Sequence, residues 1–391
     1  MSWQVKRLEE IASFNLGKML DDKKNKGDPL PYLANINVRW GEFELNDLRL
    51  MRFETSELER FSLKYGDIVM CEGGEPGRCA IWKEQLPKMM YQKALHRIRP
   101  HEGIDNQFLY YAFLHKGKRG GFSPLFTGST IKHLPKEKLA IVEVEIPEFL
   151  EQQRIATLLS KYDDLIENNK RRIELLEDSA RQLYKEWFVR FRFPGHEHVK
   201  IIDGVPEGWK KINLLNAACP TYGFAFKSEL FSEEPEGFPL IRIRDVPDRE
   251  SKTYTLESTT EDKLVADGDF LIGMDGDFHM NFWAGGKAWL NQRVVKLEGI
   301  SPFTTGYIKH AVQKPIQDFN QTITGTTVRH LGAKHLKMIE VVLPAAALLD
   351  QANSFFEDVR NQVVFLSQQN RSLNRARDLL LPKLMSGDIT V

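Results

Sequence analysis

The chain has 391 residues, of which 42% are hydrophobic, so it can form two domains with proper cores, and disorder is excluded as its default state. Its three cysteines, Cys71, Cys79 and Cys219, have no paired CxxC spacing, which argues against a disulfide framework or a zinc site. The 54 basic and 54 acidic residues cancel, which at first speaks against nucleic-acid binding, because lysine and arginine bind phosphates.

The location of the protein is predicted by the same inventory. The N-terminal sequence contains no apolar leader, and no apolar run approaches the roughly 18 residues that a membrane helix needs. An odd number of cysteines fits a reducing compartment. We therefore expect a soluble, cytoplasmic protein that is not exported.

The charges are segregated along the chain. From Lys88 to Lys138 there are ten basic and three acidic residues, and from Lys287 to Lys337 there are eight and two. Between them, Asn216 to Trp283 contains six basic and fourteen acidic residues. Each half thus has a basic stretch in its later part, which fits either contact with DNA or a solvated basic face.

The first 147 residues have the pattern of a mixed α/β module. Short strands are expected at 67–70, 94–98 and 140–146, and a helix rich in Phe, Leu and Tyr at 106–115. The glycine-rich segment 72–78 has acidic neighbours and lacks a phosphate-binding lysine, so it predicts a tight turn.

A long helix is predicted after Pro147, because seam residues recur every three or four positions over four heptads. We use "seam" for the row of side chains that faces a partner helix. The predicted seam is Leu159, Tyr162, Ile166, Asn169, Ile173, Leu176, Ala180, Leu183 and Trp187. Asn169, like Gln362 and Gln369 near the end of the chain, either fixes the register of the helix pair or lies at a seam edge and faces water.

A linker and a second module follow. Turn residues between Phe193 and Gly208 mark the linker. His196 and His198 could touch a metal, but no third ligand is near in sequence, so we expect no metal site. The second module has a strand pattern at 338–343 and a weaker helix pattern at 305–314.

The end of the chain repeats the helical spacing and closes on Pro382 and Gly387. The predicted second seam is Ala352, Phe355, Val359, Gln362, Leu366, Gln369, Leu373, Ala376 and Leu380. The two seams are the obvious partners for each other. A run of about 28 helical residues spans about 42 Å, or about 12 base pairs, so this pair could space two modules about one DNA turn apart.

The whole unit of module and helix occurs twice. Thr127-Gly-Ser-Thr-Ile-Lys-His-Leu134 returns as Thr324-Gly-Thr-Thr-Val-Arg-His-Leu331, with eight identical or conservative positions at an offset of 197. The same offset relates Ile146-Pro147 to Leu343-Pro344 and Leu183 to Leu380. This period is far too long for a solenoid, so it indicates a duplicated domain with pseudo-twofold symmetry.

Several motifs in a fixed order resemble the specificity subunit of Type I restriction-modification systems. They are Ile146-Pro147, Glu151-Gln-Gln-Arg-Ile-Ala156, Leu183-Tyr-Lys-Glu-Trp-Phe188, Pro206-Glu-Gly-Trp209 and Leu380-Leu-Pro-Lys-Leu-Met-Ser-Gly387. The second Gln-Gln-Arg motif is reduced to Asp350-Gln-Ala352, so the two halves are not fully symmetric.

The resemblance implies a mixed α/β fold with two globular target recognition domains separated by two long antiparallel coiled-coil helices. It assigns 1–147 to the first recognition domain and 148–195 to the central helix and linker. The second recognition domain would then be 196–344, and the C-terminal helix 345–391. The seam residues would form the interface between the helices and with other subunits.

The resemblance also implies a DNA-binding subunit that recognises a bipartite, asymmetric double-stranded target and is not itself an enzyme. Two modification (methyltransferase) subunits would bind the helical region, and restriction (motor-nuclease) subunits would join through them. S-adenosylmethionine, ATP and Mg would belong to those partners, and no cofactor to this chain. The sequence agrees, since it lacks a P-loop, a dinucleotide-binding glycine motif and an Asn-Pro-Pro-Tyr-like tetrapeptide.

Candidate DNA contacts fall into two groups. The repeated turns offer hydroxyl and N–H groups and one cation each, which suit phosphates, from Ser129, Thr130 and Lys132 and from Thr326, Thr327 and Arg329. Base reading is expected from residues that differ between the halves, namely Lys88, Lys93, His96, Lys118 and Arg119, and Asn281, Asn291, Arg293 and Lys296.

His133 and His330 occupy equivalent positions in the repeat. No carboxylate or nucleophile is evident beside both of them in the sequence, so we expect packing or a backbone contact rather than acid–base chemistry. Two other functions stay open from sequence. One is a coiled-coil interaction or scaffold protein without DNA recognition, and the other a self-contained DNA-modifying enzyme.

Overall fold

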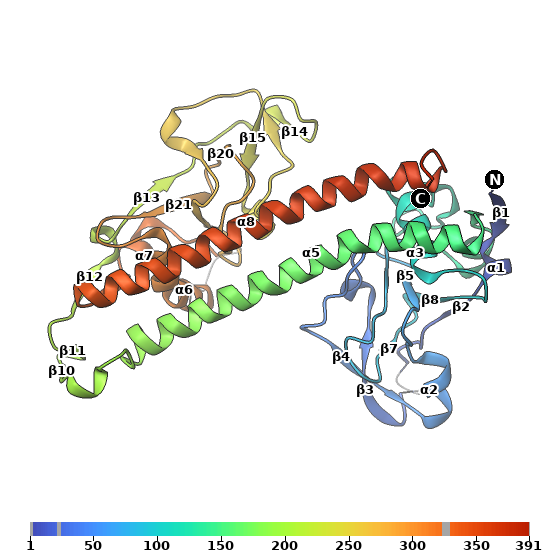
Figure 1. Cartoon of the computed structure of the whole chain (residues 1–391), viewed down its shortest axis with the longest axis horizontal. Coiled ribbons are helices and arrows are strands. Elements are labelled where there is room, and N and C mark those ends of the chain that lie inside the picture. Colours follow the sequence, from blue (N-terminus) through green and yellow to red (C-terminus); the bar gives the residue numbers. More distant parts are fainter. Residues whose placement is uncertain (1–2, 22–24, 323–328, 391) are drawn as a thin grey trace. The chain divides into compact units, whose positions relative to one another are not determined.

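The computed structural model describes residues 3–21, 25–322 and 329–390. The chain divides into two compact units. Unit 1 contains Met1–Asp164 and Asn374–Val391, and unit 2 contains Leu165–Leu373. Each unit therefore consists of one globular module together with part of both long helices (Figure 1). The four-segment division expected from the resemblance remains a prediction.

The module of unit 1 contains two sheets and a separate strand pair. The larger sheet is antiparallel with the order β2-β8-β5-β6, and the smaller has the order β4-β3-β7, in which β3 and β7 are parallel. β1 pairs with β9 and so joins the two ends of the module. The strands are β1 (Gln4–Arg7), β2 (Ala12–Leu16), β3 (Asp28–Leu33), β4 (Arg49–Phe53), β5 (Ile68–Cys71), β6 (Cys79–Ile81), β7 (Met90–Tyr91), β8 (Leu95–Pro100) and β9 (Glu143–Ile146).

The module of unit 2 repeats this arrangement. Its antiparallel sheet has the order β13-β21-β18-β19, its second sheet β14-β16-β15-β20-β17, and β12 pairs with β22. The strands are β10 (Ile201–Ile202), β11 (Val205–Pro206), β12 (Lys210–Asn213), β13 (Ala218–Tyr222), β14 (Phe231–Ser232), β15 (Phe238–Ile241), β16 (Tyr254–Thr255), β17 (Leu264–Val265), β18 (Phe270–Gly273), β19 (Met280–Phe282), β20 (Ala288–Leu290), β21 (Val294–Gly299) and β22 (Glu340–Leu343).

The two modules share one topology. The central strands β8 and β21 each pair with an early strand and with a strand that opens a hairpin. The parallel pair β3–β7 has its counterpart in β15–β20. The repeat predicted from sequence is therefore a repeat of structure, and the mixed α/β fold class is confirmed.

The helices follow the predicted positions with some differences in extent. They are α1 (Leu8–Ile11), α2 (Thr55–Phe61), α3 (Asn106–Lys118), α4 (Lys136–Ala140), α5 (Phe149–Tyr184), α6 (Thr305–Thr322), α7 (Ala333–Leu336) and α8 (Ala346–Met385). α5 continues in a π-helical turn to Val189. The strand predicted at 140–146 begins only at Glu143, because α4 occupies the preceding residues. No helix among the described residues is long and apolar enough to cross a membrane.

Each unit buries parts of both long helices in its own core. In unit 1, Ile155 and Leu159 of α5 lie in one cluster with Leu381 and Leu384 of α8. In unit 2, Ile173 and Ala180 of α5 lie in one cluster with residues of α8 from Leu349 to Leu366. Complete burial of one large aliphatic side chain contributes about 1.5–3 kcal/mol. Packing against a module therefore stabilises these helices far more than their own propensity does.

The helical segments run antiparallel within each unit. In unit 1, Asp163 forms an ion pair with Arg377. In unit 2, Asn169 donates hydrogen bonds of 2.9 Å to Asn370 and to Gln369. Asn169 is only 4% exposed, so this polar seam residue is buried rather than at a solvated edge.

Three positions of the second seam lie one residue after the predicted ones. Phe355 is 36% exposed while Phe356 is buried, so the predicted seam position of Phe355 is wrong. Gln362 and Gln369 are likewise exposed, and the buried positions are Val363 and Asn370. The other predicted positions are buried or half-buried: Leu159, Tyr162, Ile166, Asn169, Ile173, Leu176, Ala180, Leu183, Trp187, Ala352, Val359, Leu366, Leu373, Ala376 and Leu380.

Candidate nucleic-acid interface

The repeated segment of unit 1 forms a closed loop. Thr127 and His133 exchange two backbone hydrogen bonds of 2.8 and 2.9 Å, which fix the ends of the loop. Gly128 has φ +89°, and a Cβ there would lie 2.2 Å from the carbonyl oxygen of Ile131, so only glycine fits. Between these ends, the predicted phosphate contacts Ser129, Thr130 and Lys132 are exposed and stay candidates.

A surface groove of about 640 Å³ lies beside this loop and is lined in part by Thr130, Ile131 and Lys132. Trp40 and Arg78 line it as well. The Arg78 guanidinium is oriented by Glu75 at 2.7 Å and donates to the carbonyl oxygen of Asn35 at 3.1 Å. The groove therefore combines cations, a hydroxyl and an aromatic ring, which are groups that contact a nucleic-acid backbone and bases, with one carboxylate, that of Glu75.

Only part of the equivalent segment of unit 2 falls within the described residues. Thr326 and Thr327 lie outside the described residues. The Arg329 guanidinium donates to the carbonyl oxygen of Asn320 at 2.8 Å and to Asp277 at 3.0 Å. Arg329 therefore shares its charge with the protein, which distinguishes it from Lys132 on the groove of unit 1.

A carboxylate accompanies both repeated histidines, which corrects the prediction that none does. In unit 1, Nδ1 of His133 lies 3.0 Å from Oε2 of Glu72. In unit 2, Nδ1 of His330 lies 2.6 Å from Oδ1 of Asp275. Both carboxylates belong to the turn that follows the first strand of the hairpin, which is β5 in unit 1 and β18 in unit 2. Both pairs are partly accessible to solvent.

The base-reading candidates of unit 1 differ in their exposure. Lys88, Lys93 and Arg119 are exposed. Lys118 is paired with Asp378 of α8. His96 is 0% exposed and its Nε2 lies 2.8 Å from the carbonyl oxygen of Leu134, so its ring is part of the core and cannot reach a base.

The unit 2 candidates are mostly engaged within the protein. Asn281 binds Arg249 and the carbonyl oxygen of Val246, and Lys296 binds the carbonyl oxygen of Leu264. Asn291 is half-buried and accepts a bond from the N–H of Gln292. Arg293 is the most accessible candidate of this group. Its Nε lies 3.5 Å from Asp275, and about half of its side chain is exposed.

Comparison with known proteins adds a family to this geometry. The family described as "Type I restriction modification DNA specificity domain" matches residues 1–178 and 206–374. The chain belongs to this family.

Two relatives and one solved structure illustrate the match. The Type I restriction enzyme MjaIX specificity subunit of Methanocaldococcus jannaschii is 25% identical over 417 residues, covering 100% of this chain and 94% of the relative. The EcoBI specificity subunit of Escherichia coli is 31% identical over 191 residues, covering 48% of this chain and 40% of the relative. The S subunit of M. genitalium shares the fold, with a TM-score of 0.59 at 19% identity over 98% of this chain and 96% of the other. The chain is thus a specificity subunit with DNA sequence recognition domains.

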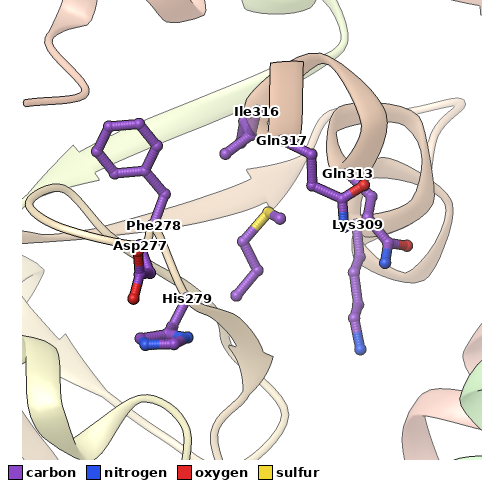
Figure 2. A pocket seen from close by; sticks show the side chains of 8 residues that line it. Asp277, Phe278, His279, Lys309, Gln313, Ile316 and Gln317 are labelled. Atoms are coloured by element: carbon purple, nitrogen blue, oxygen red, sulfur yellow. The ribbon is translucent and has the colours of Figure 1, made fainter. Parts of the chain in front are cut away.

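A cavity of about 210 Å³ lies in unit 2 of this specificity subunit. Figure 2 shows Asp277, Phe278 and His279 on one side and Lys309 and other residues of α6 on the other. Its volume is below the range of about 300–1,000 Å³ that is usual for ligand pockets. Asp277 is bonded to Arg329, and Lys309 is bonded to Glu177, so its main charges are already satisfied internally.

Lys309 belongs to a buried polar cluster that attaches the module of unit 2 to α5. Its Nζ donates a hydrogen bond of 2.7 Å to Glu177 and lies 4.3 Å from the ring centroid of Phe282. Glu177 also accepts a hydrogen bond of 2.9 Å from Arg249. Burial raises the pKa of Glu177, but the charges of Lys309 and Arg249 outweigh burial and leave that pKa lowered. Burial lowers the pKa of Lys309 despite its carboxylate partner. The cluster fixes the module on the helix and offers no open acid–base pair.

Sequence reasoning missed four residues of the interface, because segment 72–78 predicts only a tight turn. The fold brings Glu72 and Asp275 to the repeated histidines, and Trp40 and Arg78 to the groove beside the loop of unit 1. Among the described residues, no group of three or more His, Cys, Asp or Glu side chains could hold a metal ion.

Proposed function

We propose that this chain selects a bipartite, asymmetric DNA target, with one half-site read by each module. The observation that carries the proposal is that the modules share one topology but present different side chains at equivalent exposed places. Lys93 and Arg293, for example, follow equivalent glutamines just before β8 and β21. Lysine and arginine present different hydrogen-bonding geometries to base edges, so equal scaffolds with unequal surfaces suit unequal half-sites.

The chemistry would belong to other subunits. The relatives are named as specificity subunits of restriction enzymes, which supports a division between the chain that chooses the site and the chains that act on it. We propose that two methyltransferase subunits bind the helical region and that motor-nuclease subunits join through them. S-adenosylmethionine, ATP and Mg would be bound by those subunits, and adenine methylation and DNA cleavage would occur there.

The phosphate contacts would be centred on the loop of unit 1. Ser129, Thr130 and Lys132 are exposed on it and two of them line the groove beside it. Lys132→Glu should weaken DNA binding uniformly across sequences, because a phosphate contact carries no base information. The matched control is Lys200→Glu, which reverses an equally exposed lysine outside the groove. Equal effects of the two changes would contradict the assigned surface.

The decisive experiment is co-expression of the chain with a candidate methyltransferase subunit from the same genome, followed by mapping of methylated adenines across a genome. We expect methylation at a split sequence whose two halves differ. Exchange of the module of unit 2 for that of a relative should change one half and leave the other intact. A continuous target, a target unchanged by the exchange, or methylation by the purified chain alone would overturn the proposal.

A further inference from the structure

The two hydrogen-bonded pairs Glu72–His133 and Asp275–His330 have no role in the function described so far. They occupy the same place in both modules, between the repeated segment and the turn after β5 or β18. In each module the residue after the histidine also bonds to that turn. The N–H of Leu134 donates to the carbonyl oxygen of Glu72, and that of Leu331 to the carbonyl oxygen of Met274, both at 2.7 Å.

The carboxylate reaches the histidine from different positions in the two modules. The backbone bonds place Glu72 and Met274 as equivalents. The isolated strand bridges agree, because His133 is opposite Gly73 and His330 is opposite Asp275. In unit 1 the carboxylate that contacts the histidine thus comes from Glu72, one residue before the bridge. In unit 2 it comes from Asp275, the bridge residue itself. Two different solutions give the same contact, which indicates that the contact, rather than a residue inherited with the repeat, is required.

The contact joins the loop of unit 1 to the wall of its groove. On one side, His133 closes the loop that carries Ser129, Thr130 and Lys132. On the other, Glu72 begins the turn that carries Glu75 and Arg78, which lines the groove. Each backbone residue that is ordered only on binding costs about 1–2 kcal/mol of conformational entropy. A tie that holds the loop in advance would remove part of that cost.

We infer that Glu72 and His133 are positioning residues that hold the loop of unit 1 in place for contact with the DNA backbone, and that Asp275 and His330 make the equivalent contact in unit 2. This inference rests on the proposed function. It predicts that the change in DNA affinity on loss of Glu72 has the opposite sign from the change that simple charge repulsion predicts. Phosphates repel a carboxylate, so loss of Glu72 should strengthen DNA binding if electrostatics alone applies. Loss of the positioning contact predicts weaker binding.

The test uses unit 1, because Asp275 also lies 3.5 Å from Arg293 and its removal would release that cation. Glu72→Ala keeps the backbone bonds of residue 72 and removes only the carboxylate. Glu197→Ala is the matched control, because it also removes an exposed carboxylate beside histidines, in the linker. Affinity of the full-length chain for a fluorescent duplex of random sequence would be measured by anisotropy, and thermal unfolding would be recorded for each variant.

We expect Glu72→Ala to weaken binding by about tenfold, as loss of a hydrogen bond to a charged group would, with little change in thermal unfolding. Glu72→Gln, which still accepts a hydrogen bond, should bind nearly as the parent does.

The outcomes separate this inference from the function beneath it. A parent chain that binds no duplex, alone or with the co-expressed methyltransferase, would contradict the proposed function. If the parent chain binds the duplex and Glu72→Ala binds it as tightly as Glu197→Ala or more tightly, the positioning role alone is overturned.

Discussion

Replacement of His310 with phenylalanine should remove a large part of the acid sensitivity of unit 2. The imidazole is 5% exposed, lies 4.8 Å from the ring of Phe356, and has a buried Nδ1 without a hydrogen-bond partner. Burial, assisted by the adjacent Lys309 charge, lowers the pKa of His310 from 6.5 to about 3. Glu177 opposes this shift, and Arg181 adds to it.

The sign and size follow from linkage. Below about pH 6.5, His310 binds a proton in the unfolded chain but not in the folded one. The free energy of unfolding is therefore highest above about pH 6.5 and falls as the pH is lowered toward the folded pKa of about 3. At about pH 5 the difference is about 1.5 pK units, or about 2 kcal/mol. His310→Phe should therefore match the parent within about 1 kcal/mol near neutral pH, since it keeps the ring packing. It should exceed the parent by about 2 kcal/mol near pH 5.

Urea unfolding would be monitored by hydrogen exchange in peptides of α6, so that the signal reports on unit 2 alone. This choice matters because a chain of two units need not unfold in one step. His198→Gln is the control, because the side chain of His198 is 84% exposed. Its pH dependence should match that of the parent. Parallel pH curves for the parent and His310→Phe would show that the buried imidazole is not the source of acid sensitivity.

Three further predictions concern the helices and the loop. Asn169→Leu should destabilise unit 2 by about 1–3 kcal/mol, because Asn370 loses a buried bond, and adding Asn370→Leu should restore most of that loss in thermal unfolding. Lys132→Ala should lower the salt dependence of DNA binding by about one phosphate contact in a salt titration, and an unchanged slope would argue against the contact. Inserting seven residues after Ile166 and after Leu373 should lengthen the preferred spacer by about three base pairs, at about 1.5 Å per residue, while a constant spacer would refute the helices as a ruler.

The duplicated architecture was predictable from sequence because the repeat is local and ordered. The offset of 197 between the repeated segments continues into both helices, and the central strands β5 and β18 are short, continuous apolar runs. The strand β3 was not predictable, because it contains Pro29 and Pro31, which cannot donate to a sheet. The structure accommodates them where β3 has only one neighbour, since β7 pairs only with Tyr32 and Leu33.

The register of the second seam illustrates a limit of heptad spacing. Steps of three and four fit both Phe355 and Phe356, and both Gln362 and Val363, because neighbouring positions differ by only about 100° around a helix. Packing against α5 and α6 decides between them, and it buries Phe356 and Val363. That packing joins segments far apart in the chain, so the sequence of α8 alone does not contain the choice.

The carboxylates beside the histidines escaped sequence comparison for a related reason. His133 and His330 differ by 197 positions, whereas Glu72 and Asp275 differ by 203. Part of the difference comes from loops of unequal length, and one residue of it comes from the shift of the carboxylate across the strand bridge. A search at fixed offset pairs neither carboxylate with the other, although each lies within hydrogen-bond distance of its histidine.

The asymmetry of the two modules extends beyond the residues expected to read bases. Lys132 lines an open groove, whereas its counterpart Arg329 is engaged by Asp277 and by the backbone of Asn320. A guanidinium that already donates to a carboxylate has less charge to offer a phosphate. Arg293, the base-reading candidate of unit 2, is about half exposed but also lies 3.5 Å from a carboxylate, that of Asp275. Equal sequence motifs therefore do not imply equal shares of DNA affinity, and the half-site facing unit 1 should account for the larger part of the salt dependence.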